Sequence, residues 1–191
     1  LQAIEAVAAE QGTQNKALGR ERGSEQLSLS DADYSLLDLL SQLVDKSLLL
    51  VEHRNATPRY RMLETVRAYG LGQLAAAGET ELARDRHQAY FLALAEAAES
   101  HWFGANQVAW LDLIALEHDN LRAALDRAMT GADAHAALRM VTSLRSFWYT
   151  RGHYDEGRQR ILRALALPAA QARTALRASA LNAAGAHLWA G

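Results

Sequence analysis

The chain has 191 residues, half of them apolar, and its 20 basic and 22 acidic side chains give a formal net charge of −2. This balance argues against a surface dominated by nucleic-acid binding, and the absence of cysteine excludes disulfides, thiolate chemistry and cysteine zinc sites. No apolar run approaches the ~20 residues that cross a bilayer, and no signal peptide opens the sequence, so we expect a cytoplasmic protein. Both ends fall inside apolar helical patterns, so we expect a piece of a longer protein, truncated at its C-terminus.

Residues 1–29 predict a partial helix followed by a flexible loop, because apolar spacing gives way to polar and glycine-containing sequence from Gly12 onward. Helical spacing returns after this segment, where Ser30, Asp31 or Asp33 could cap a helix start. The apolar residues from Leu36 to Val44 then predict an amphipathic helix.

The hydrophobic period changes after this helix. The continuous apolar run 48–51 predicts a strand buried on both sides, and Asn55 to Pro58 predicts a turn. Residues 59–62 alternate arginine with apolar side chains, as in a strand with one polar face, and helical spacing resumes from Leu63. Helix, hairpin and helix together predict a winged-helix-like domain over residues 30–78.

Residues 79–191 predict only helices, which are separated by Gly104, by Gly131 and by a tight turn at Gly152. We expect Thr80 to cap the first of these helices, and a kink or restart near Asp119–Asn120. The last helix carries an apolar stripe, part of which we expect to pack against the Tyr154–Leu165 helix: Leu176, Leu181, Ala184 and Leu188. The predicted fold class is therefore mainly α, with a small winged-helix-like unit and one β-hairpin followed by antiparallel helical hairpins.

Part of the helical region resembles a tetratricopeptide repeat. The positions that match the repeat are Leu144, Trp148, Gly152, Tyr154, Gly157 and Ala164. Arg145 departs from the pattern, because it stands where the family prefers a small residue, and the spacing to Gly185 suggests a repeat longer than the family's ~34 residues. The resemblance implies a tetratricopeptide-like α-solenoid with a structural role for the matching residues.

The stretch Leu36–Glu52, followed by Arg59–Tyr69, resembles the winged-helix arm of bacterial signal-transducing NTPases of the STAND or NB-ARC type, which are often LuxR-type transcriptional regulators. Residues 116–125 are similar to the segment that follows that arm. The resemblance implies an ATP-binding core elsewhere in the polypeptide, an arm that relays its state, and repeats that bind an unknown protein, peptide or small molecule. The chain lacks a Gly-x-x-x-x-Gly-Lys-Ser/Thr run, so we expect no bound ATP and no catalysis here.

Other motifs with possible chemistry are weak. Gly70–Ala75 spells a dinucleotide fingerprint, but it falls inside a helical stripe rather than between a strand and a helix. The neighbours Glu117, His118 and Asp119 point in different directions on a helix, which favours a surface or capping role over a metal site. We therefore predict no catalytic, cofactor-binding or metal-ligating residue.

Four arginines gather around the predicted hairpin: Arg54, Arg59, Arg61 and Arg67. They could contact DNA phosphates or another domain of the same polypeptide. Because Glu52 and Glu64 dilute the positive charge, and the preceding helix carries Asp38 and Asp45, we expect a solvated or interdomain surface rather than direct DNA binding.

The predicted function is regulatory and non-catalytic: coupling of an absent NTPase core to a helical platform that binds a protein or ligand. The alternative is a DNA-binding winged-helix transcriptional regulator, and an enzyme is a third class without a positive feature. We also expect either self-association through the C-terminal helix or fraying of this helix, because some of its apolar residues lack a following partner helix.

Overall fold

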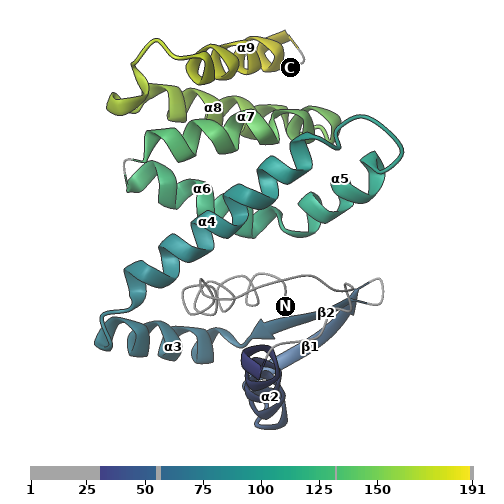
Figure 1. The fold of residues 1–191 in the computed structure, drawn as a ribbon, viewed down its shortest axis with the longest axis vertical. Coiled ribbons are helices and arrows are strands. Elements are labelled where there is room, and N and C mark those ends of the chain that lie inside the picture. Colours follow the sequence, from purple (N-terminus) through teal and green to yellow (C-terminus); the bar gives the residue numbers. More distant parts are fainter. Residues whose placement is uncertain (1–30, 55–56, 132, 190–191) are drawn as a thin grey trace, which may run out of the picture. The chain divides into compact units, whose positions relative to one another are not determined.

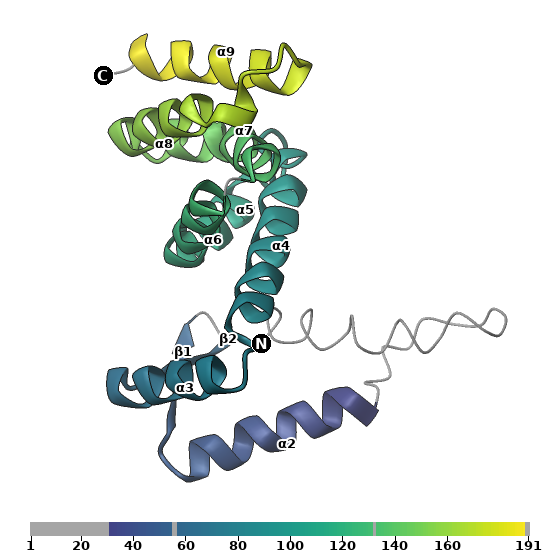
Figure 2. The same ribbon diagram turned by 90° about the vertical axis from the view of Figure 1, so that its left-hand side faces the viewer.

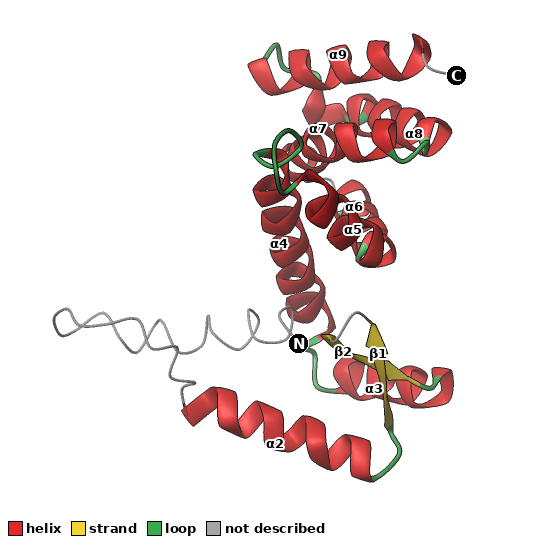
Figure 3. Cartoon of the chain, turned by 90° about the vertical axis from the view of Figure 1, so that its right-hand side faces the viewer, coloured by secondary structure: helices red, strands yellow, loops and turns green. Residues whose placement is uncertain are grey.

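The structure is a computed structural model that describes residues 31–54, 57–131 and 133–189. Within these residues the chain is mainly helical with one two-stranded antiparallel sheet, which confirms the predicted fold class (Figure 3). The contacts divide the chain into two compact units, the first ending at Ala83 and the second beginning at Arg84.

The described part of the first unit contains α2 (Asp31–Asp45), β1 (Leu49–Arg54), β2 (Thr57–Met62) and α3 (Glu64–Ala76), which Figure 1 labels. Helix α2 ends in a tight turn in which Ser47 adopts a φ of 56°. The Leu48 amide donates to the Leu43 carbonyl at 2.9 Å, and the Ser47 amide donates to Val44 at 2.8 Å. These bonds satisfy carbonyls that the end of a helix leaves unpaired, and they direct the chain into β1.

Helix α2 packs against β1, where Leu40 and Leu49 are each 5% exposed. Two expectations for the hairpin are wrong in detail. Leu50 is 44% exposed, because a two-stranded sheet covers only one face and successive side chains alternate between faces. Thr57 and Pro58 belong to β2 rather than to the turn, and Pro58 is tolerated because both strands are edges.

Helix α3 follows β2 and buries none of its residues within the described structure. Gly70 and Gly72 lie in the middle of this helix, so their amides are committed to the helix rather than open to a phosphate. The dinucleotide-like pattern therefore lies inside a helix, as the helical spacing predicted.

The helices of the second unit are α4 (Thr80–Glu99), α5 (Gln107–Leu116), α6 (His118–Thr130), α7 (Ala134–Thr150), α8 (Tyr154–Ala166) and α9 (Ala175–Trp189), with a short 3-10 helix at Pro168–Ala170. Helix α4 starts at the end of the first unit. Helix α7 contacts α6, α8 and α9, and α8 and α9 also lie side by side (Figure 2). None of the described helices is long and apolar enough to cross a membrane.

Helix α7 forms the centre of this unit. Its aromatic and aliphatic side chains are almost fully buried, with Phe147 at 0%, Met140 at 0% and Trp148 at 1% exposure. A helix that is apolar on most of its surface must be covered on several sides, and α6, α8 and α9 supply that cover.

The helical region differs from the sequence expectations at two points. The break between α5 and α6 lies at Glu117, just before the expected Asp119–Asn120. Thr80 does not cap α4, because it is already the first helical residue and its buried hydroxyl makes no hydrogen bond. Among the side chains of α9 that the structure describes, the buried ones belong to alanines, including Ala180 and Ala184, whereas Leu181 is 50% exposed. The side chain of Leu188 lies outside the described part. Small side chains let α9 approach α8 and α7 closely.

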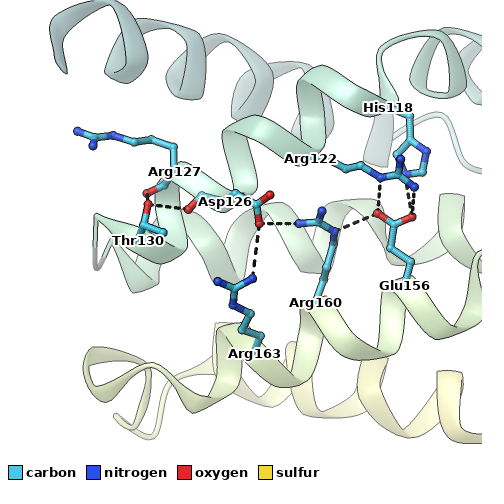
Figure 4. Close-up of polar contacts among 8 residues, drawn as sticks. All are labelled: His118, Arg122, Asp126, Arg127, Thr130, Glu156, Arg160 and Arg163. Atoms are coloured by element: carbon cyan, nitrogen blue, oxygen red, sulfur yellow. Dashed lines mark hydrogen bonds and ion pairs between the residues drawn. The ribbon is translucent and has the colours of Figure 1, made fainter. Parts of the chain in front are cut away.

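A polar network joins α6 to α8, and Glu156 on α8 is its centre (Figure 4). Arg122 donates through Nε to one Glu156 oxygen at 2.7 Å and through Nη2 to the other at 2.6 Å. Arg160 donates to Glu156 at 3.0 Å and also to Asp126 at 3.1 Å. The Glu156 side chain is only 19% exposed, so these contacts lie in a partly desolvated position.

The environment of Glu156 stabilises its carboxylate form. Burial alone would raise the pKa of Glu156, but the hydrogen bonds from Arg122 and Arg160 and the neighbouring His118 outweigh burial and lower the pKa to about 2. His118 faces the same carboxylate at 3.4 Å, and burial lowers the pKa of this imidazole although Glu156 opposes the shift. Glu156 therefore remains ionised and holds α6 against α8 at neutral pH.

Candidate functional site

The hairpin register places two of the predicted arginines on one face. Arg59 pairs with Glu52 and Arg61 pairs with Leu50, and residues directly opposite each other in an antiparallel sheet share a face. The opposite face carries Leu49, which is buried against α2. The outer face of the hairpin therefore carries two guanidinium groups beside one carboxylate, together with the exposed Leu50.

Arg61 is the more accessible of these two arginines. Its side chain is 73% exposed, and its Nη1 lies 3.5 Å from a Glu52 oxygen, while the Glu52 side chain is 43% exposed. An ion pair this exposed contributes little free energy, so an arriving phosphate could replace Glu52 as the partner of Arg61. Glu52 thus reduces the positive charge of this face but does not block access to Arg61.

Arg54 and Arg67 occupy different positions. Arg54 is the last residue of β1 and pairs with Thr57 next to the hairpin tip, and its side chain lies outside the described part. Arg67 lies on α3, where its Nε and Nη2 donate to the two Glu64 oxygens at 3.0 Å each. The hydrogen bonding to Glu64 raises the pKa of Arg67 and lowers the pKa of Glu64. The structure therefore does not bring all four arginines together: Arg67 is engaged by its own helix.

Helix α2 directly precedes the hairpin and has a mixed polar surface. Asp38 and Asp45 are exposed, as the sequence predicted, and Ser41 and Gln42 are exposed between them. The Ser41 hydroxyl donates to the Leu37 carbonyl at 2.9 Å. The sequence reasoning named the two aspartates and overlooked Ser41 and Gln42. Both residues lie on the helix surface away from the buried Leu40, so helical spacing could have predicted their exposure.

The residues predicted to be structural in the repeat pattern lie around the turn between α7 and α8. Leu144 and Trp148 are 2% and 1% exposed on α7, and Gly157 and Ala164 are buried on α8. Gly152 adopts a φ of 76° at the turn, and Tyr154 contacts Tyr149 edge to face at 5.6 Å. Their roles in a repeat stay predictions.

His118 does not occupy the surface position that the sequence suggested. Its side chain is 13% exposed, and its ring lies 5.1 Å from the Phe147 ring and 4.9 Å from the His153 ring. The ring is enclosed because α6 packs against α7, which sequence spacing alone did not reveal. Among the described residues, no group of three or more histidine and acidic side chains is arranged to hold a metal ion.

Comparison with known families matches residues 24–75 to a winged helix-turn-helix domain. The chain is similar to a protein named "Putative HTH-type transcriptional regulator" in Mycobacterium bovis and to proteins of the same description in two strains of Mycobacterium tuberculosis. Each is 39% identical over 132 residues, which cover 67% of this chain and 14% of the relative. The chain thus spans about one seventh of the length of these relatives. No solved structure gives a significant match.

These matches overturn one prediction from the sequence. The expectation that this chain does not bind DNA directly is wrong, because its first unit matches a winged helix-turn-helix domain and its relatives are described as HTH-type regulators. The relatives are described as transcriptional regulators, in agreement with the prediction of a non-catalytic chain.

Proposed function

We propose that this chain is a DNA-binding winged-helix segment of a bacterial transcriptional regulator, and that its hairpin contacts the phosphate backbone. The observation that carries the proposal is the outer face of the hairpin, where Arg59 and Arg61 lie together within the segment that matches a winged helix-turn-helix domain. The names of the mycobacterial relatives support the same function.

The two elements of the domain have different tasks in this proposal. The hairpin arginines supply charge-assisted contacts to phosphates, which position the domain and are independent of sequence. Helix α2 presents the amide of Gln42 and the hydroxyl of Ser41, which are groups that can hydrogen-bond to base edges in a major groove. Asp38 and Asp45 repel nearby phosphates, so affinity depends strongly on the hairpin.

A coupling function for an ATPase core is not part of this proposal, because no observation on the chain favours it over direct DNA binding. The relatives are several times longer than this chain, so their other activities stay outside the proposal as well.

The proposal is tested by fluorescence anisotropy with a mixed-sequence DNA duplex at about 0.1 M salt. We expect the chain to bind, and we expect Arg59→Ala combined with Arg61→Ala to weaken binding at least about tenfold, because two phosphate contacts are lost. The control combines Arg158→Ala with Arg163→Ala on α8, which removes the same charge at exposed positions of the second unit. Absence of binding by the unmodified chain, or an equal loss in both double variants, would refute the proposal.

A further inference from the structure

A cavity of about 410 Å³ lies in the second unit between the α4–α5 connection, α7 and α9. This volume falls in the range of pockets that hold small organic ligands. Trp102 and Phe103 line it from the connection, and Arg145 and Tyr149 line it from α7. All of these residues belong to one compact unit, and none belongs to the proposed DNA surface.

One wall of the cavity has a fixed geometry. Trp102 is 3% exposed, and its indole Nε1 donates to the Ser143 carbonyl on α7 at 2.8 Å. The Gln107 amide donates to the Trp102 carbonyl at 2.6 Å, which ties the connection to the start of α5. The wall is therefore formed before any ligand arrives, which lowers the entropic cost of binding.

Two residues that line the cavity also expose aromatic surface to solvent. Phe103 is 85% exposed and Tyr149 is 51% exposed. Large aromatic side chains gain free energy when a flat ring covers them, either stacked or edge to face. The cavity thus favours a planar apolar group.

Arg145 gives the cavity a positive charge. This residue departs from the repeat pattern, in which a small side chain is preferred, and the structure shows that it is one of the residues that line the cavity. Its Nη2 lies 3.6 Å from a Glu99 oxygen, and both side chains are about two-fifths exposed. The other Glu99 oxygen accepts a hydrogen bond from the Ser143 hydroxyl at 2.9 Å, so Glu99 is held in place by α7. At 3.6 Å the ion pair is longer than a hydrogen bond, and a carboxylate in the cavity can bind Arg145 more closely.

We propose that this cavity binds a small planar aromatic carboxylate, with its ring against the aromatic wall and its carboxylate on Arg145. The α9 side chains that face the cavity are small, and Ala186 is one of them. A larger residue at position 186 would therefore fill the space that the ring occupies. The ligand would act on the helical unit, separately from the DNA surface of the first unit.

The test is a calorimetric titration of the chain with 1-naphthoate, and with neutral 1-naphthylmethanol as the matched uncharged probe. We expect 1-naphthoate to bind with a Kd below about 1 mM, which is ordinary for a ligand of this size. Arg145→Gln should weaken 1-naphthoate about tenfold and leave 1-naphthylmethanol unchanged, since only the charged contact is lost. Ala186→Trp should abolish binding of both probes.

Arg163→Gln on α8 removes an exposed arginine that does not line the cavity and should leave both affinities unchanged. Circular dichroism checks that each variant keeps its helix content. If Ala186→Trp fails to fold, the Arg145→Gln comparison decides alone. No binding of 1-naphthoate, or equal affinity of the Arg145→Gln variant for it, would overturn the proposal. Unchanged binding to a folded Ala186→Trp variant would overturn it too.

Discussion

Replacing Glu156 by glutamine should destabilise the helical unit, because this carboxylate joins α6 to α8. Glutamine has nearly the same shape but no charge, so Arg122 and Arg160 lose their shared anionic partner while the packing of α8 is retained. The Arg160 and Glu156 side chains are 17% and 19% exposed, so water compensates only partly for the lost charge.

The pKa of Glu156 gives the size of this effect. Lowering of the Glu156 pKa from 4.5 to about 2 corresponds to about 3 kcal/mol of free energy of unfolding, at about 1.4 kcal/mol for each pKa unit. Part of this shift comes from His118, which carries a charge only when protonated, and burial lowers the pKa of His118. We therefore expect a loss of about 2–3 kcal/mol at neutral pH.

Urea unfolding, monitored by tryptophan fluorescence, measures the free energy of unfolding of the helical unit, because all four tryptophans lie after Arg84. The control is Asp119→Asn, which removes another carboxylate bound to Arg122 at 3.1 Å, but one that is 95% exposed. We expect this control to change the free energy of unfolding by less than about 0.5 kcal/mol. If Glu156→Gln were as mild as Asp119→Asn, or the control equally damaging, the assignment of Glu156 as the centre of the network would be wrong.

The same network predicts a pH dependence. Because the folded-state pKa of Glu156 is lowered, its contribution is fully present above the unfolded pKa near 4.5 and disappears as the pH falls toward about 2, so the difference between the unmodified chain and Glu156→Gln should shrink over that range. Urea titrations at several pH values measure it, and a difference that stays constant down to pH 2 would contradict the predicted shift. A second pair of variants concerns glycine. Gly152→Ala should destabilise by about 1 kcal/mol because its φ is 76°, although a Cβ there meets no neighbour, whereas Gly185→Ala inside α9 should stabilise by about 0.5–1 kcal/mol. Thermal unfolding of both variants checks the opposite signs, and a shift in the same direction would refute the backbone argument.

Sequence periodicity predicted the helix, hairpin and helix of the first unit because the hydrophobic period changes where the chain leaves α2. It did not predict the exposure of Leu50, because burial of a strand depends on how many strands the sheet has. It also identified Arg59 and Arg61 but not their common face, since the register depends on where the turn closes.

In the helical unit, the sequence predicted features that depend on neighbouring residues, but not features that depend on contacts between distant residues. Gly152 marked the turn because a positive φ favours glycine whatever the surroundings are. The partners of Glu156 could not be read in the same way, because Arg122 lies 34 residues away on another helix. Arg145 was recognised only as a departure from a repeat pattern. Its place beside a cavity depends on α9 and on the α4–α5 connection.

The central claim is that the hairpin arginines bind DNA phosphates, and the salt dependence of binding tests it most directly. Each phosphate contact releases counterions and contributes about 0.9 to the slope of log affinity against log salt concentration. Anisotropy titrations across a salt series should therefore give a slope about 2 units shallower for Arg59→Ala combined with Arg61→Ala than for the unmodified chain. An unchanged slope, even with weaker affinity, would contradict the claim that these two side chains contact phosphates.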